Sequence, residues 1–106
     1  MAKYLLQASY TADGAKGLLK DGGSKRLAAA RALVESLGGK IDCMYFAFGE
    51  IDVVAIVEMP DPASAAAASL TIGASGGLSG TMTVLLTPEE LDQATKKSAK
   101  YTPPGK

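Results

Sequence analysis

Two neighbouring apolar segments in the middle of the chain constrain its fold more than any other feature. Residues 40–48, KIDCMYFAF, and residues 52–59, DVVAIVEM, are rich in β-branched, aromatic and aliphatic side chains, and a short patch that begins at Gly49 separates them. Apolar segments on either side of a short glycine-containing connection are typical of a β-hairpin. We therefore expect two antiparallel strands here.

Both faces of these two strands are apolar. Because side chains alternate along a strand, the first strand is expected to present Met44, Phe46 and Phe48 on one face and Ile41, Cys43, Tyr45 and Ala47 on the other. The second strand is expected to present Val53, Ala55, Val57 and Met59 opposite Asp52, Val54, Ile56 and Glu58. Neither strand has a fully polar face, so we expect the sheet to be covered on both sides.

The first third of the chain predicts a strand followed by two helical pieces. Residues 3–10, KYLLQASY, have the length and composition of a strand. Residues 15–37 have apolar side chains at helical spacing, and Gly22-Gly23-Ser24 predicts a break between two helices. Thr11 or Asp13 is expected to cap the first helix and Ser24 the second. Gly38-Gly39 is expected to end the second helix.

The last third predicts a helix, a strand and a final helix. Asp61 or Ser64 is expected to cap an alanine-rich helix that runs to Gly73. The glycine-rich segment 72–81 is expected to form a flexible lid or linker, and the strand after it covers about 81–86. Thr87, followed by Pro88 and by Glu90, forms a strong helix-start signal.

The predicted order is β-α-β-β-α-β with an added C-terminal helix. This order is typical of the α+β class with a ferredoxin-like arrangement, in which helices cover one face of an antiparallel sheet. A chain of 106 residues fits one domain. We expect that domain to span residues 1–100, with a flexible tail at 101–106.

The uncovered face of such a sheet predicts a partner. Four strands would leave an apolar patch of several hundred Å², which is more than soluble monomers usually expose. A second copy packed sheet to sheet is the expected cover, because burying about 1,000 Å² contributes about 25 kcal/mol before association costs. The alternatives are that the C-terminal helix folds under the sheet, or that it embraces the partner.

Composition excludes several classes of function. Acidic and basic residues balance at 11 each and basic residues come no denser than in pairs, so we expect no nucleic-acid or membrane partner. The single cysteine, Cys43, excludes an internal disulfide and fits a reducing compartment, and the N-terminus lacks the apolar core of a secretory signal, so we expect a cytoplasmic protein. Histidine is absent. We therefore expect no metal site and no cofactor.

A few polar residues are candidates for a site. Tyr10 and Tyr45 are candidates for lining a ligand pocket between the sheet and the helices, and Asp52 for contacting a ligand at the end of the hairpin; the alternative for each is a structural role. Gly49 is expected to adopt a backbone angle that other residues avoid. Five charged residues of the first helical region are expected to form a solvated helical face, namely Lys16, Lys20, Asp21, Lys25 and Arg26.

Three segments resemble the GYD family of small bacterial proteins. They are KYLLQASYTADGAKGLLKDG, FAFGEIDVVAIVEMPD and GTMTVLLTPEEL, and the likeness covers nearly the whole chain. The resemblance implies a dimeric α+β barrel, in which two sheets pack on each other. Gly49 and Asp52 match the family's Gly-Tyr-Asp turn signature, whereas Ile51 occupies the tyrosine position.

The sequence favours binding over catalysis. No constellation of acid, base and nucleophile is present, so we expect a homodimer that binds a small, largely apolar molecule or serves as an interaction module. The alternative is a cofactor-free enzyme of the monooxygenase or isomerase kind, whose small aromatic or carbonyl substrate would be oriented by Tyr10, Tyr45 or Asp52.

Overall fold

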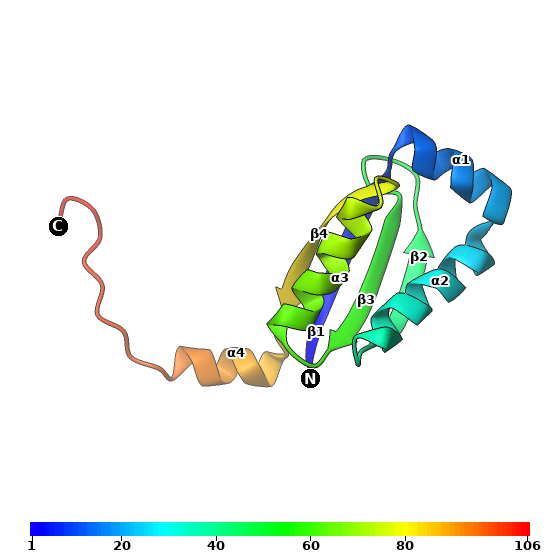
Figure 1. The fold of residues 1–106 in the computed structure, drawn as a ribbon. Coiled ribbons are helices and arrows are strands. Elements are labelled where there is room, and N and C mark those ends of the chain that lie inside the picture. Colours follow the sequence, from blue (N-terminus) through cyan, green and yellow to red (C-terminus); the bar gives the residue numbers. More distant parts are fainter.

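A computed structural model describes all 106 residues of the chain (Figure 1). Four strands and four helices follow one another in the order β1 (Ala2–Tyr10), α1 (Ala12–Asp21), α2 (Gly23–Ser36), β2 (Lys40–Phe46), β3 (Val53–Met59), α3 (Pro62–Ala74), β4 (Leu78–Leu85) and α4 (Pro88–Thr95). The predicted order of elements is confirmed, with the first helical region divided at Gly22.

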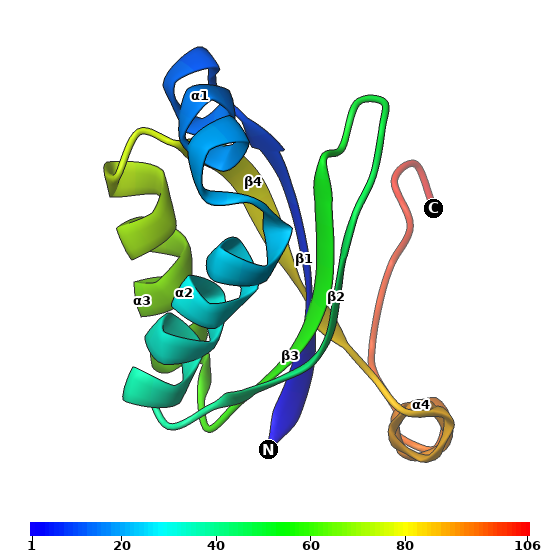
Figure 2. The same ribbon diagram turned by 90° about the vertical axis from the view of Figure 1, so that its right-hand side faces the viewer.

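The strands form one antiparallel sheet in the order β2-β3-β1-β4. Helices α1, α2 and α3 all lie on one side of this sheet, and the other side is bare (Figure 2). The ferredoxin-like α+β prediction is therefore confirmed.

The core lies between the sheet and these helices. Every second side chain of β3 is buried there, which gives the set Val53, Ala55, Val57 and Met59. Tyr4 of β1, Val34 of α2 and Ala65 and Ala68 of α3 join the buried set. Only nine residues of the chain are buried, so much of its apolar surface remains accessible.

A bulge in β2 changes one predicted face. Ile41 pairs with Val57 of β3, whereas Cys43 pairs with the neighbouring Ile56, so β2 has one extra residue at this point. Ile41 consequently shares the helix-covered face with Met44, and both line the same cavity. The expectation that Ile41 shares a face with Cys43 and Tyr45 is wrong, because strict alternation does not pass through a bulge.

The helix starts follow the expected capping chemistry with one exception. Thr11 caps α1 by accepting a hydrogen bond from the Gly14 N–H, and Asp61 caps α3 by accepting one from Ser64. Thr87 and Glu90 form a reciprocal capping box at α4. The prediction that Ser24 caps α2 is wrong: the cap position is two residues earlier, at Gly22, and it has no side-chain cap.

The glycine-rich segment 72–81 is not a lid. Its first residues complete α3, and β4 already begins at Leu78. The turn between them is tied to the start of α1, because the Thr11 N–H donates to the Gly77 carbonyl at 3.0 Å and the Thr11 hydroxyl donates to the Gly76 carbonyl at 2.7 Å. Gly80 is required by the close approach of β4 to β1, since a Cβ there would lie 2.4 Å from the Gln7 carbonyl oxygen.

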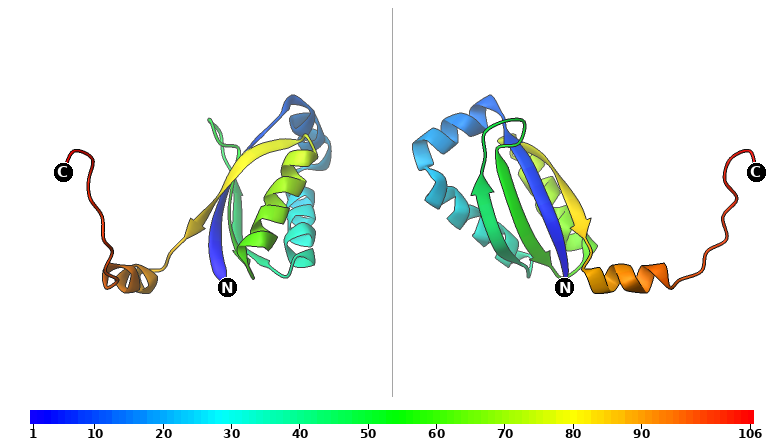
Figure 3. Two further views of the ribbon diagram at one scale, coloured as in Figure 1. Left: turned by 60° about the vertical axis from the view of Figure 1, so that its left-hand side comes forward. Right: turned by 180° about the vertical axis from the view of Figure 1, so that it is seen from behind.

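Helix α4 and the residues after it project away from the rest of the chain (Figure 3). All eight residues of α4 are exposed. The projection explains a radius of gyration of 16.9 Å, which exceeds the ~13 Å of a compact domain of 100 residues. Helix α4 does not fold under the sheet in this chain.

Candidate functional site

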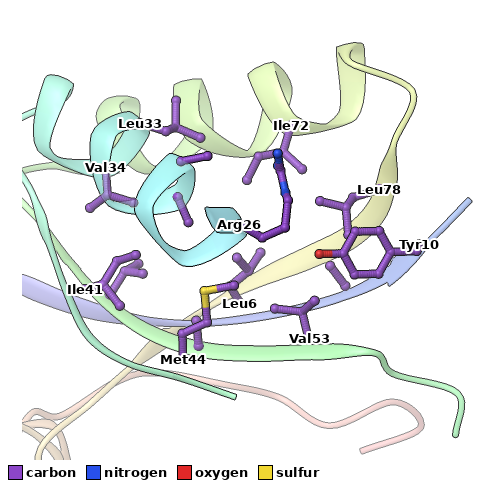
Figure 4. Close-up of a pocket in the computed structure, with 15 residues that line it drawn as sticks. Leu6, Tyr10, Arg26, Leu33, Val34, Ile41, Met44, Val53, Ile72 and Leu78 are labelled. Atoms are coloured by element: carbon purple, nitrogen blue, oxygen red, sulfur yellow. The ribbon is translucent and has the colours of Figure 1, made fainter. Parts of the chain in front are cut away.

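An apolar cavity lies between the sheet, α2 and α3 (Figure 4). Its volume is about 100 Å³, and 14 of the 15 residues that line it are hydrophobic. The strands β1 and β3 supply its floor through Leu6, Ala8, Val53, Ala55 and Val57. We call this space the inner cavity.

Small side chains leave the inner cavity open. Four of the lining residues are alanines, namely Ala8, Ala29, Ala30 and Ala55. Helices α2 and α3 stand apart over the sheet (Figure 1), and the inner cavity is lined from both of them. Protein interiors are normally close-packed, so an alanine-lined space at the centre of the helix layer is a site where a small apolar guest would fit.

Tyr10 stands at the end of the inner cavity and also borders a second hollow. Its hydroxyl end turns into the cavity, on the side where Arg26 lies (Figure 4). On its other side Tyr10 lines an open groove of about 440 Å³ together with Asp52 and with residues of α1, α2 and the hairpin, among them Phe46 and Phe48. We call this second space the outer groove. The structure therefore brings Tyr10 and Asp52 to the same end of the sheet.

Asp52 is held by backbone hydrogen bonds. Its carboxylate accepts a hydrogen bond from the Tyr10 N–H at 2.9 Å, and its own N–H donates to the Ala8 carbonyl at 2.9 Å. The Ala47 N–H donates to the Asp52 carbonyl at 2.8 Å, which closes the hairpin loop. One carboxylate oxygen thus fixes the end of β1, and the other oxygen has no hydrogen-bond partner within the chain.

The loop geometry explains Gly49. Its φ of +144° lies in a region that side chains disfavour, as expected from the sequence. Phe48, next to it, is fully exposed at the tip of the hairpin.

Tyr45 lies on the opposite side of the sheet from Tyr10 and Asp52. It pairs with Val54 in the register of β2 and β3, and 69% of its surface is exposed. The bare side of the sheet carries an apolar centre, which we call the open sheet face and which comprises Leu5, Cys43, Tyr45, Val54 and Ile56. Within one chain Tyr45 cannot contribute to the inner cavity.

Charged side chains mark one end of the open sheet face. Lys3 of β1 pairs with Asp42 of β2, and the Lys40 ammonium lies 3.2 Å from the Glu58 carboxylate. The hydrogen bond with Asp42, and then the negative charges of Asp42 and Glu58, raise the pKa of Lys3 above its usual value of 10.5. The two positive and two negative charges cancel, so this end of the open sheet face is bordered by charged side chains whose net charge is zero.

Arg26 was not expected at the site. The sequence places it on a solvated helical face, whereas the structure places it in the first turns of α2 as the one charged residue that lines the inner cavity. The signal was present in the helical spacing: Arg26 lies one turn before Ala29 and Ala30 and two turns before Leu33, and these three residues also line the cavity.

The chain has neither a cluster of metal-binding side chains nor a helix that could cross a membrane. No three His, Cys, Asp or Glu side chains come together in a group that would hold a metal ion. None of the helices combines the length and the apolar composition needed to cross a membrane.

Comparison with known protein families shows to which family this chain belongs. The GYD domain matches residues 4–95. The chain belongs to the GYD family. This match confirms the resemblance and covers every element from β1 to α4. Searches of the curated proteins and of the solved structures found no significant match.

The turn that resembles the family's signature, Gly49 to Asp52, lies at the hairpin, and Asp52 lines the outer groove. Gly49 and Asp52 supply the positive φ and the backbone-bound carboxylate of this turn. Ile51, at the position where the resemblance implies a tyrosine, is half-buried. A phenol at that position is therefore not part of the site in this GYD protein.

Proposed function

We propose that this GYD protein is a homodimer that binds a small, largely apolar molecule without transforming it. The observation that carries the proposal is the inner cavity, whose lining is hydrophobic at 14 of 15 positions. Ligand sites are typically apolar hollows with a few polar groups that orient the ligand. An engineered cavity of about 150 Å³ in another protein binds benzene, so a space of about 100 Å³ suits a guest of roughly four or five carbons.

The open sheet face supports the homodimer. Leu5, Val54 and Ile56 form its centre, and none of α1, α2 and α3 covers this side of the sheet (Figure 2). Helix α4 projects on this same side of the sheet (Figure 2), where it would reach a partner packed face to face. Isolated helices as short as α4 are marginal in water, so contact with a partner would supply the packing that its own chain does not.

Binding is tested by titrating ¹⁵N-labelled protein with cyclopentane and recording amide chemical shifts. Shifts that saturate and cluster at Ala30, Ala55 and Leu33 are expected. Uniformly small shifts up to the solubility limit of cyclopentane would contradict the proposal.

The dimer is tested by native mass spectrometry and by light scattering after gel filtration. A mass of twice the chain is expected at micromolar concentration, and removal of residues 88–106 is expected to weaken the association. A monomer at micromolar concentration would overturn this part of the proposal.

One observation favours a second candidate function, a cofactor-free enzyme acting on a carbonyl substrate. Tyr10 and Asp52 share the outer groove, and one Asp52 oxygen is free to accept a proton. This function predicts that the protein accelerates exchange of the α-hydrogens of cyclopentanone for deuterium, measured by NMR. Asp52→Asn would abolish that exchange, and Tyr45→Phe, on the other side of the sheet, would leave it unchanged.

A further inference from the structure

The inner cavity has one charged residue, and it stands where the cavity meets solvent. Arg26 also lines a neighbouring, more polar hollow of about 240 Å³, which it shares with Tyr10, Leu78 and Asp21. The side chain of Arg26 remains 35% exposed. Arg26 therefore borders both the inner cavity and this more polar hollow, which we call its mouth, and the Tyr10 hydroxyl is turned toward the Arg26 side chain (Figure 4).

The chain does not satisfy this guanidinium. Its nearest carboxylate oxygen, Oδ2 of Asp21, lies 3.7 Å from Nη1, which is too long for a hydrogen bond. The other oxygen of Asp21 lies 3.7 Å from the Lys25 ammonium. One carboxylate is thus shared by two cations, and the three side chains carry a net charge of +1 (two positive charges and one negative). The five N–H donors of a guanidinium are suited to a planar carboxylate.

We propose that the natural ligand is a small amphipathic monocarboxylate, whose apolar body fills the inner cavity and whose carboxylate binds Arg26 and the Tyr10 hydroxyl at the mouth. This inference rests on the proposed binding function and names the class of its ligand. The lining of the inner cavity contains no acidic residue, and the negative charge of Asp21 at the mouth is outweighed by the positive charges of Arg26 and Lys25. A branched body of about four carbons matches the volume of about 100 Å³, and its carboxylate remains partly hydrated in the polar mouth.

The test compares two probes that have the same apolar body, one with a negatively charged carboxylate and one with a neutral amide. The probes are 3-methylbutanoate and 3-methylbutanamide, and their dissociation constants are measured by NMR titration at neutral pH. The carboxylate is expected to bind about tenfold or more tightly than the amide, because hydrogen bonds to a charged partner are the stronger ones. Arg26→Met is expected to remove this preference while leaving amide binding within about twofold, since the methionine keeps the apolar stem of the side chain.

A matched control uses the same helix. Arg31 is exposed and does not line the cavity, so Arg31→Met is expected to keep the full preference for the carboxylate. Circular dichroism of both variants reports that they fold. Equal affinities of the two probes for the native protein, or a preference that persists in Arg26→Met, would overturn the inference but leave the binding function intact if cyclopentane still binds. Failure of both probes and of cyclopentane would overturn the binding function together with the inference.

Discussion

Gly14 and Gly77 touch so closely that no side chain fits between them. A Cβ on Gly14 would lie 1.9 Å from the Gly77 carbonyl oxygen. The contact presses the first turn of α1 onto the turn between α3 and β4, beside the hydrogen bonds that Thr11 donates to the same turn. Two segments far apart in the sequence are thus joined at the end of the sheet where Tyr10 lies.

Gly14→Ala is expected to lower the free energy of unfolding. The backbone must shift to accommodate the methyl group, at a cost of about 1–3 kcal/mol. Gly17→Ala, in the same helix, is the control: a Cβ there meets nothing within 4 Å, and alanine in a helix interior is favoured over glycine by about 0.5–1 kcal/mol. Urea denaturation of both variants measures the two effects, and changes of the same sign would contradict the assignment of the contact.

Filling the inner cavity is expected to stabilise the protein and abolish binding. Ala30→Leu places three more carbons in the cavity, and burial contributes about 0.8 kcal/mol per methylene group before any strain, so we expect a net gain of about 1–2 kcal/mol. Ala28→Leu adds the same atoms to an exposed position of α2 and should change neither property. Thermal unfolding and cyclopentane titration provide the measurements. A destabilised Ala30→Leu variant that still binds would show that the cavity lies elsewhere.

A charge on the open sheet face is expected to break the proposed homodimer. Ile56→Lys would place two unpaired ammonium groups at a two-fold interface, and we expect the dimer to weaken by about 100-fold or more. Leu19→Lys makes the same change at a helix position that is 88% exposed and should leave the dimer intact. Sedimentation equilibrium distinguishes them. An Ile56→Lys protein that associates as strongly as the native one would exclude the open sheet face as the interface.

Asp61 is expected to make stability depend on pH in the acid range. The hydrogen bonds from Ser64 lower the pKa of Asp61 below its usual value of 3.8. A lowered folded-state pKa means that the stabilisation is present above the unfolded value and is lost as pH falls through the folded value. The native protein should therefore lose stability below about pH 4 more steeply than Asp61→Asn, since asparagine also caps helices but does not titrate. Identical melting curves for the two proteins from neutral to acid pH would contradict this role.

Local chemistry made the fold predictable. Thr87 predicted one helix start, Thr11 and Asp61 were each one of two predicted caps, and alternation placed Val53, Ala55, Val57 and Met59 on one face of β3, which the structure buries. The misplaced features depended on contacts between distant residues. The bulge at Ile41 is set by pairing with β3, and the turn at Gly76 and Gly77 is ordered by Thr11, about 65 residues away in the sequence.

The candidate site was harder to predict from the sequence than the fold. Tyr10 and Asp52 were both candidates, and only the strand order brings them to the same end of the sheet. Tyr45 was grouped with them because its type suits a pocket, but the pairing with Val54 places it on the other side. Arg26 was grouped with solvated charges because of its charge, although its helical spacing to Ala30 and Leu33 placed it on the same side of α2 as these two residues.

The sheet separates the inner cavity from the open sheet face. In a dimer formed through that face, each protomer would have its own inner cavity on the outer side of the dimer. The backbone of the sheet would lie between the inner cavity and the dimer interface. Ligand binding in one inner cavity would then have no direct contact path to the other inner cavity. Each chain would bind one ligand molecule, and binding would show no cooperativity. Any partner that responds to the guest would have to contact α2 and α3 on the outside of the assembly.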